Sequence, residues 1–393
     1  MPVVEPDFSL PEPSSADQAK SLQLVAHLRA RMEAAPLTFS DYMTDVLYHP
    51  TLGYYSSGQV TFGAGGDFVT APERSPLFAD GLVYEWQQAR ADGLGAQVLE
   101  LGAGSGQLLI DFMTECERRG CVPDRYWVLE ISPALRARQQ SRVTAELPPQ
   151  LAARVQWISD DTVLCDPQQG WAGGMVIANE VLDAMPAARF RWVPGEVASV
   201  RELGVHPVNG RFDWCELSPS EALMAAVSDL AAHLGPVEPG AESVAAEINP
   251  NLTAWLSELR HSLGNAETRI YLFDYGGRSA DVYRADREEG TLRCHYRHRA
   301  HDDPFVYPGL QDLTTWVDFE RLSRLARTVG FAVDGTRTQA AWLLGTDVPA
   351  RFAAKMQAIT DRAEASRLSQ GFKELVLPTE MGERFQVLRL RLG

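Results

Sequence analysis

The chain has 393 residues, of which 45% are hydrophobic and 22% charged, and its formal net charge is -16 at pH 7. This balance is typical of a folded globular protein and excludes an intrinsically disordered chain. The negative charge argues against nucleic acid as the main partner, because phosphate binding depends on clustered Lys and Arg. It suits a cationic cofactor or a basic substrate, although acidity also keeps many proteins soluble.

The sequence shows no signal for a membrane or an oxidising compartment. No apolar run approaches the roughly 20 residues that a membrane-spanning helix needs, so we expect no membrane insertion. The five cysteines have no CxxC spacing, which indicates a reducing compartment. The N-terminal residues lack both the apolar stretch of a signal peptide and the Arg-rich character of a mitochondrial presequence. We therefore expect a cytoplasmic protein.

The N-terminal quarter is predicted to hold a leader, a helix and a lid. Residues 1–20 are rich in Pro, Ser and acids and are expected to form a flexible leader. Apolar positions recur at helical spacing from Leu22 to Met32, and Pro36 ends that helix. The Tyr- and Gly-rich stretch 41–76 is interpreted as a structured lid, or alternatively as a loop packed on the core. Together, residues 21–95 form the predicted N-terminal helical and lid segment.

Residues 96–188 alternate between short apolar runs and amphipathic helices. The predicted strands are Val98–Leu101, Tyr126–Glu130, Val155–Ile158 and Gly174–Ala178. A helix follows from Gln107 to about Arg118, ended by Gly120. Strands and helices alternating in this way predict a parallel sheet with right-handed crossovers. The fold class is therefore α/β and Rossmann-like, with a mainly parallel twisted sheet flanked by helices.

The pattern changes after Pro186. Residues 189–265 contain antiparallel strand patterns, a hairpin turn at Asn209-Gly210 and two helical stretches, so they are predicted to be an insertion on the substrate side. Residues 266–393 are expected to complete the catalytic core, with a buried strand at Ile270–Phe273 and a last strand at Phe385–Leu392.

The glycine loop after the first core strand indicates which cofactor binds. Gly102, Ala103, Gly104 and Gly106 form the loop, and Gln107 stands where a dinucleotide fold needs its third glycine. No GxxxxGK[ST] phosphate loop occurs in the sequence. S-adenosylmethionine (SAM) has no phosphate; it has a sulfonium, an ammonium and a carboxylate. A helix start for the carboxylate and the acid Glu100, two residues before the loop, for the ammonium are the expected complement.

Further polar residues follow the other core strands. Glu130 ends the second strand, where an acid can accept hydrogen bonds from both ribose hydroxyls. Asp160 and Asp161 follow the third strand and are predicted to reach the adenine amino group, although all of these acids can also be solvated strand-end residues. Ile131 and Asn179 complete the predicted cofactor-binding set.

Two acids follow the fourth strand, in the run Asn179-Glu180-Val181-Leu182-Asp183. Spaced three residues apart, Glu180 and Asp183 can share one face of a helical turn. Two carboxylates can hold a planar guanidinium and aim one nitrogen at the sulfonium. We therefore predict Glu180 and Asp183 as catalytic residues; the alternative is that Asp183 caps local backbone.

With these motifs in hand, the chain resembles the MidA-like methyltransferases from about Leu37 to Leu390. This family includes the mitochondrial NADH:ubiquinone oxidoreductase assembly factor that dimethylates an arginine symmetrically. The resemblance rests on the following segments: Leu47–Pro50, Gly53–Tyr55, Gly66–Glu73, Leu99–Gly106, Glu130–Pro133, Asn179–Ala184, Asp274–Gly276, Pro308–Gly309, Asp312–Thr314 and Val317–Phe319. Ala79, where glycine is expected, and Trp316 depart from the family pattern.

The resemblance implies a SAM-binding core over which the segment Gly66–Glu73 closes. Gly66, Asp67, Phe68 and Thr70 are therefore added to the predicted cofactor-binding residues. It also implies an arginine-containing protein substrate, most plausibly a subunit of a respiratory NADH dehydrogenase, and a homodimer is possible. Two other readings stay open: methylation of a small molecule, and a SAM-binding assembly chaperone that needs no turnover.

A metal site is the main rival for the C-terminal part. Cys294, His295, His298 and His301 have spacing that can present zinc ligands on one face. Three arginines interleave with them and oppose a divalent cation, so we expect no metal. These groups are expected to line the substrate mouth or a polar surface.

Overall fold

The computed structural model describes residues 10–56, 70–166, 168–234 and 242–393. Its largest sheet has the strand order β15-β16-β10-β5-β2-β3-β4, with β14 also paired to β10. The strands are β2 (Gln97–Leu101), β3 (Arg125–Leu129), β4 (Val155–Ile158), β5 (Gly174–Asn179), β10 (Thr268–Gly277), β14 (Val317–Asp318), β15 (Ala332–Thr338) and β16 (Phe385–Leu392). β2, β3, β4, β5 and β10 are parallel, and β16 is antiparallel to both of its neighbours. The predicted Rossmann-like α/β fold is confirmed.

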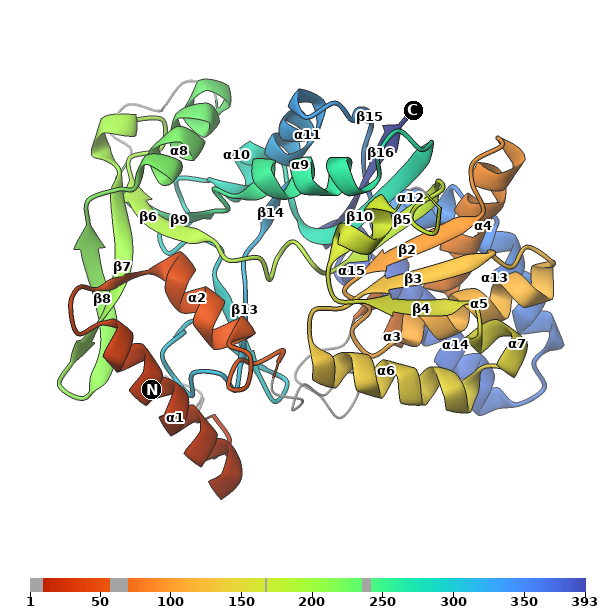
Figure 1. Cartoon of the computed structure of the whole chain (residues 1–393), viewed down its shortest axis with the longest axis horizontal. Helices are drawn as coiled ribbons and strands as arrows, with labels where there is room; N and C mark the ends of the chain where they lie inside the picture. The colour runs from red at the N-terminus through yellow and green to blue at the C-terminus, as the bar shows by residue number, and fades with distance from the viewer. Residues whose placement is uncertain (1–9, 57–69, 167, 235–241) are drawn as a thin grey trace, which may run out of the picture.

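Helices cover both faces of this sheet (Figure 1). One face carries α3 (Ala71–Arg74), α4 (Leu77–Ala91), α5 (Gln107–Arg119), α6 (Pro133–Glu146), α7 (Pro149–Ala152), α12 (Gln339–Leu344), α13 (Val348–Ala358), α14 (Arg362–Val376) and α15 (Met381–Arg384). The other face carries α9 (Leu252–Ser262), α11 (Phe319–Thr328) and the 3-10 helix η2 (Asp161–Cys165). Because both faces are covered, the central strands are apolar on both sides.

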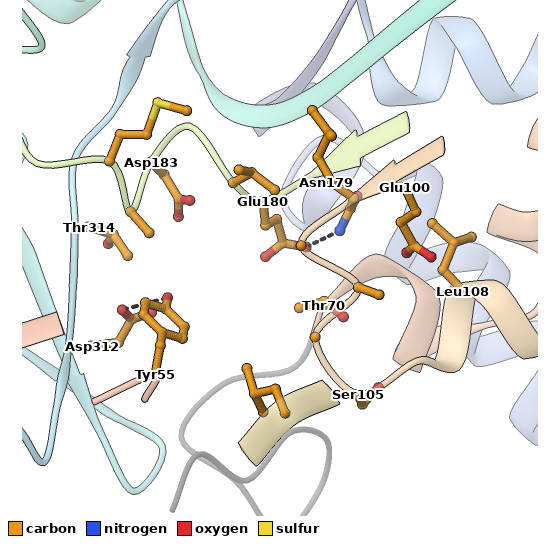
Figure 2. A pocket seen from close by; sticks show the side chains of 18 of the residues that line it. Tyr55, Thr70, Glu100, Ser105, Leu108, Asn179, Glu180, Asp183, Asp312 and Thr314 are labelled. Carbon is orange, nitrogen blue, oxygen red and sulfur yellow. Dashed lines mark hydrogen bonds between the residues drawn. The ribbon is translucent and has the colours of Figure 1, made fainter. Parts of the chain in front are cut away.

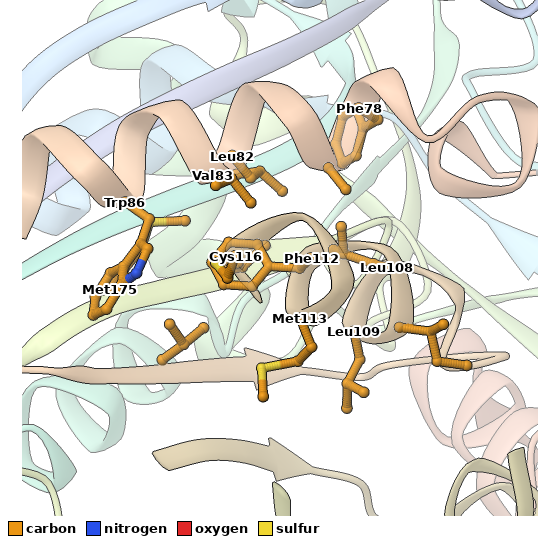
Figure 3. Packing of buried hydrophobic residues seen from close by; sticks show 14 of the residues in the cluster. Phe78, Leu82, Val83, Trp86, Leu108, Leu109, Phe112, Met113, Cys116 and Met175 are labelled. Carbon is orange, nitrogen blue, oxygen red and sulfur yellow. The ribbon is translucent and has the colours of Figure 1, made fainter. Parts of the chain in front are cut away.

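The packing of α4 and α5 on the sheet shows why these helices form where they do (Figure 3). Phe112 of α5 is fully buried and contacts Tyr126 of β3 with ring centroids 5.7 Å apart. The helix begins after Gly106 and ends at Gly120, both with left-handed backbone, which matches the predicted bounds to one residue. Truncating a side chain buried like Phe112 to alanine costs about 3–5 kcal/mol, so this packing fixes the helix that follows the glycine loop.

A second sheet is antiparallel and lies beside the first (Figure 1). It contains β1 (Leu37–Thr38), β6 (Ala188–Trp192), β7 (Arg201–Val208), β8 (Arg211–Leu217) and β9 (Val244–Ile248). The predicted hairpin turn joins β7 to β8, with φ angles of 47° at Asn209 and 82° at Gly210. α1 (Ser15–Arg31) and α2 (Phe39–Tyr48) pack with this sheet in one core, and α8 (Glu221–His233) packs with it in another. Since β1 pairs with β7, the N-terminal segment and the expected insertion share one sheet.

A small third sheet connects to the same region. It contains β11 (Arg293–Tyr296), β12 (Arg299–His301) and β13 (Asp312–Thr314), and α10 (Ser279–Val282) precedes it. Cys294 and Leu313, on neighbouring strands, are buried in the core that contains α1 and α2. This packing brings β13 close to the residues that follow β5 in the main sheet.

One predicted boundary is wrong. Residues 15–20, assigned to the flexible leader, are the first turns of α1. Ser14 caps this helix by accepting a hydrogen bond of 3.2 Å from the N–H of Asp17. Leu24 and Leu28, later in the helix, are fully buried and anchor it. The polar first turns can therefore be helical although they show no apolar pattern. No helix in the described ranges is both long and apolar enough to cross a lipid bilayer.

Candidate active site

A cavity of about 920 Å³ opens at the carboxyl ends of β2, β3 and β5 (Figure 2). Its walls come from the glycine loop, the residues that follow β3 and β5, the end of α2 and the strand β13. Parallel α/β sheets bind ligands at this edge. The cavity is large enough for a nucleoside cofactor together with part of a second molecule.

The glycine loop forms one wall of the cavity. Gly102, Gly104 and Gly106 all have positive φ, at 65°, 53° and 81°. Side chains are strained in this region of backbone space, so the loop needs its glycines for conformation. The N–H of Gly102 donates a hydrogen bond of 3.0 Å to the carbonyl of Leu129, which ties the loop to the end of β3. Ala103 lines the cavity between these glycines.

Two buried acids flank the loop. Glu100 accepts a hydrogen bond of 2.8 Å from the hydroxyl of Tyr126, and burial raises the pKa of Glu100 to about 7. Glu130 accepts hydrogen bonds of 2.9 Å from the N–H of Ser132 and from the amide of Gln139. Burial also raises the pKa of Glu130 above its usual value. Carboxylates held in this way are oriented toward a ligand before it binds.

Other cavity residues complete a set that fits a nucleoside with a sulfonium. Ile131 is 61% exposed although it is apolar, and it lines the cavity beside Glu130. It thus offers an apolar surface to a flat base. Asn179 Oδ1 is buried without a hydrogen-bond partner among the described residues. The acids suit the cationic groups of SAM, and the start of α5 suits its carboxylate. The apolar surface suits the base, and the unpaired amide oxygen suits a polar donor.

Glu180 lies between the two halves of the cavity (Figure 2). The N–H of Ala71 and the amide of Asn179 each donate a hydrogen bond of 3.2 Å to its Oε1. Burial, and secondarily the charge of Asp183, raises the pKa of Glu180 to about 8. Its backbone has φ of 53°, so the residues after β5 form a turn and not the predicted helical turn.

Asp183 is buried at the end of this turn, and burial raises its pKa to about 6. The N–H groups of Leu182 and Asp183 donate to Asp274 Oδ2, at 2.9 and 3.1 Å. Asp274 therefore helps to hold the turn. Hydrogen bonds from Tyr275 and from the backbone of Ala184 oppose the effect of burial on the pKa of Asp183, so a capping role for Asp183 stays open.

The wall opposite the glycine loop contains residues that were not predicted as site residues. The hydroxyl of Tyr55 donates a hydrogen bond of 2.8 Å to Asp312 Oδ1. Tyr48 stacks on Tyr55 with ring centroids 5.5 Å apart and donates to the carbonyl of Ala184 at 2.9 Å. The Tyr-rich character of the predicted lid was a signal for this wall. Asp312 lies far along the chain, and its only signal was its place in a segment of the family resemblance.

Four predicted cofactor residues need separate mention. Thr70 lines the cavity, as expected for the lid, whereas Gly66, Asp67 and Phe68 lie outside the described residues.

Asp160 and Asp161 are not at the cavity. Asp160 caps η2 by accepting a hydrogen bond of 3.1 Å from the N–H of Thr162. Asp161 accepts a hydrogen bond from the hydroxyl of Ser262 on α9. Their carboxylates are thus used in local structure, and the expectation that they reach adenine stays a prediction.

The Cys and His cluster forms part of a β-hairpin. Cys294 faces His301 across β11 and β12, and Arg297 and His298 occupy the turn with positive φ. His295, together with Arg293, lines the cavity. These two side chains therefore form part of the cavity wall.

The fold and the cavity define a SAM-dependent methyltransferase. Residues 77–337 match a family described as S-adenosyl-L-methionine-dependent methyltransferases, and the chain belongs to this family. The resemblance found in the sequence is confirmed, and SAM is the cofactor of this enzyme.

Two groups of relatives support this assignment. The chain is similar to the mitochondrial protein arginine methyltransferase NDUFAF7 homolog of Drosophila melanogaster, with 28% identity covering 100% of this chain and 90% of the relative. The human protein arginine methyltransferase NDUFAF7, also mitochondrial, is 26% identical over 93% of this chain and 83% of its own length. A crystal structure from Burkholderia thailandensis, bound to S-adenosyl-homocysteine, is 35% identical with a TM-score of 0.83, covering 97% of this chain and 95% of that one.

Proposed function

We propose that the enzyme methylates the guanidinium group of an arginine side chain in a protein substrate. The observation that carries the proposal is the acidic wall beside the cofactor half of the cavity, where Glu180 and Asp183 line one space and Asp183 is buried. A buried carboxylate of this kind is costly until a cation pairs with it. The relatives from Drosophila and human, both called protein arginine methyltransferases, support the same acceptor.

Roles in cofactor binding are proposed for the predicted residues that line this half of the cavity. SAM supplies an electrophilic methyl group on its sulfonium. Gly102, Ala103, Gly104 and Gly106 would place the start of α5 at the methionine carboxylate, and Glu100 would take the ammonium. Glu130 would accept the ribose hydroxyls, with Ile131 against the base. Asn179 and Thr70 would close the site, and Gly66, Asp67 and Phe68 belong to this proposal by family resemblance.

Glu180 and Asp183 are proposed to hold the acceptor. As carboxylates they would pair with the guanidinium and direct one nitrogen at the methyl group. Methyl transfer needs in-line approach more than proton transfer, so positioning would supply most of the rate. The hydrogen bond from Ala71 to Glu180 couples this acid to the beginning of α3, which belongs to the predicted lid.

The finer details of the proposal rest on the family resemblance. They are symmetric dimethylation of the arginine and a subunit of respiratory NADH dehydrogenase as the substrate. A bacterial cytoplasmic setting is proposed beside them.

The test uses purified enzyme, methyl-labelled SAM and a set of basic peptides that differ at one position. That position holds arginine, lysine or citrulline, which is a neutral isostere of arginine. We expect label on the arginine peptide alone, and acid hydrolysis should release symmetric dimethylarginine. Label on lysine, or on small molecules of a cell extract and not on protein, would overturn the proposal.

The variant Glu180→Gln tests whether this acid holds the acceptor. Glu180→Gln should bind S-adenosyl-homocysteine and lose at least about 10-fold in turnover with the arginine peptide. Glu216→Gln, which changes an exposed acid on β8, is the matched control and should behave as wild type. Unchanged turnover in Glu180→Gln would contradict the role of this acid in holding the acceptor, and wild-type enzyme that binds the cofactor without turning over any acceptor would favour the chaperone.

A further inference from the structure

The cavity is divided into two chemically different halves (Figure 2). Glu100, Asn179 and Ser105 lie on the side of the glycine loop, and Asp183, Thr314, Asp312 and Tyr55 gather on the other side. The proposed cofactor roles use the first half. In the second half they use Asp183 alone, so Asp312 and Tyr55 have no role yet.

The two acids of the second half come from distant parts of the chain that are joined by the backbone. The N–H of Thr315, which follows β13, donates a hydrogen bond of 3.0 Å to the carbonyl of Asp183. β13 therefore lies beside the turn after β5, and its first residue, Asp312, lines the same cavity as Asp183. Both residues are buried, at 3% and 5% exposure.

The polar groups of this half are arranged to accept hydrogen bonds. Asp183 and Thr314 line this half of the cavity, and the hydroxyl of Tyr275 is within reach of both. Tyr55 donates its hydroxyl hydrogen to Asp312 Oδ1 and thereby orients that carboxylate. Two acids and a hydroxyl in one buried space call for a cation with several donors.

The shape and the remaining charges favour a planar cation. Tyr48 and Tyr55 stack with an interplanar angle of 22°, and both line this half of the cavity. Guanidinium groups stack on aromatic rings and offer donors in a fork, whereas an ammonium is a compact point charge. Arg293, which also lines the cavity, is paired with Asp302, so its charge is already balanced.

We propose that Asp312, oriented by Tyr55, joins Glu180 and Asp183 in binding the acceptor guanidinium, so that these residues determine the specificity for arginine. Asp312 is a substrate-contacting residue in this arrangement, and Tyr55 is a positioning residue that acts through it. The inference rests on the proposed arginine methyltransferase function and adds the residues that select the acceptor.

The first experiment measures binding without turnover. Nα-acetyl-arginine amide is titrated into full-length enzyme saturated with S-adenosyl-homocysteine, and Nα-acetyl-citrulline amide is the neutral counterpart. Wild type should bind the arginine derivative at least about 10-fold more tightly than the citrulline derivative. Asp312→Asn should lose this preference, and Tyr55→Phe should reduce it. Asp213→Asn, an exposed acid on β8, should keep it.

The second experiment measures kinetics with the arginine peptide. In Asp312→Asn we expect KM for the peptide to rise roughly 10- to 100-fold, with the affinity for S-adenosyl-homocysteine within about 2-fold of wild type. Tyr55→Phe removes one hydroxyl and should raise KM less. A general structural defect would instead lower the affinity for the cofactor product as well.

The outcomes separate the two proposals. If wild type methylates arginine and both variants keep the wild-type KM and ligand preference, the role of Asp312 is overturned while the arginine activity stands. If wild type methylates no arginine, the proposed function fails. If wild type shows no preference for the arginine derivative in the titration, the proposed role of these carboxylates in selecting arginine is overturned. If Asp312→Asn does not fold, Tyr55→Phe and its KM decide.

Discussion

The side-chain amide of Gln139 donates a hydrogen bond of 2.9 Å to Oε2 of Glu130. The same amide group donates to the carbonyl of Gly104 at 2.9 Å, and Gln139 Oε1 accepts from the indole of Trp157 at 3.0 Å. Gln139 is fully buried, so one side chain on α6 ties the glycine loop to the acid at the end of β3. The shape of the cofactor half therefore depends on a residue that does not line the cavity.

Replacing Gln139 with leucine should weaken cofactor binding. The change leaves Glu130 and the carbonyl of Gly104 without a buried donor, and each such loss costs about 1–3 kcal/mol. We expect S-adenosyl-homocysteine to bind roughly 10- to 100-fold more weakly by calorimetry. Gln140→Leu changes the exposed neighbour on the same helix and should leave binding unchanged. Equal affinities for the two variants would contradict the link.

A pair of glycine substitutions separates backbone strain from cofactor binding. Gly106 and Gly93 have similar positive φ, 81° and 90°. A methyl group at Gly106 would lie 3.6 Å from Gln139 Cγ, an ordinary contact, and at Gly93 it would meet nothing within 4 Å. Each alanine variant should therefore lose about 1–2 kcal/mol of stability from strain. Only Gly106→Ala should also weaken binding of S-adenosyl-homocysteine; if Gly93→Ala weakened it equally, global destabilisation would be the cause.

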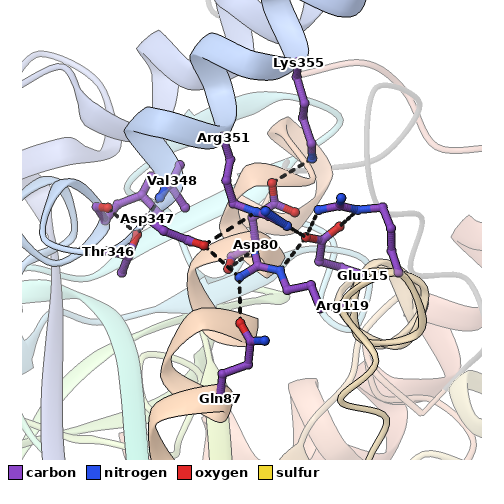
Figure 4. A network of polar contacts seen from close by, with 11 residues as sticks. Asp80, Gln87, Glu115, Arg119, Thr346, Asp347, Val348, Arg351 and Lys355 are labelled. Atoms are coloured by element: carbon purple, nitrogen blue, oxygen red, sulfur yellow. Dashed lines mark hydrogen bonds and ion pairs between the residues drawn. The ribbon is translucent and has the colours of Figure 1, made fainter.

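A network of charged residues holds α13 against α4 and α5 (Figure 4). Glu115 accepts hydrogen bonds from Arg118, Arg119 and Arg351, and Lys355 pairs with Asp80 at 2.7 Å. Burial opposes ionisation of Glu115, but the hydrogen bonds from Arg118 and Arg119 outweigh it and lower its pKa to about 2. Its contribution to stability is therefore complete above pH 4.5 and is lost as the pH falls toward 2.

Glu115→Gln should destabilise the enzyme in a pH-dependent way. Breaking a buried ion pair from one side costs about 3–5 kcal/mol, and we expect the lower end because Arg118 is half exposed. Thermal unfolding at pH 7 should show a lower Tm than wild type, and the difference should shrink as the pH falls from 4.5 toward 2. Asp286→Asn, which breaks an exposed pair with Arg284, should change Tm very little. A difference that grew at low pH would contradict this account of Glu115.

Local patterns were enough to predict the core of the fold. β2, α5, β3 and β4 were found within a residue or two because apolar runs of fixed length lie between glycines, prolines and capping residues. The glycine loop was recognised for the same reason, since its conformation depends on neighbours in the chain.

The acceptor wall was not predictable in this way. Tyr55 and Asp312 are 257 positions apart and meet because β13 and the segment after α2 pack in one core. The local role of Asp160 was unforeseen for a related reason. The end of a strand fixes where the backbone lies but not where the side chain points, and Asp160 caps η2 instead. Contacts that depend on how distant elements pack leave little trace in a single sequence.

Glu180 should make the ligand-free enzyme less stable at alkaline pH. Burial raises its pKa to about 8 from an ordinary value of 4.5. The unfolded chain therefore releases this proton more readily, and stability contributed by the neutral acid declines as the pH rises from 4.5 to 8. Glutamine is neutral throughout and can still accept the hydrogen bond from Ala71. Glu180→Gln should thus be more stable than wild type at pH 8, by about 2–6 °C in Tm, and nearly equal to it at pH 4.5.

The same variant is expected to lose turnover, because a neutral amide cannot pair with a cationic acceptor. A Tm difference that does not change with pH would show that Glu180 is ionised in the folded enzyme from low pH upward.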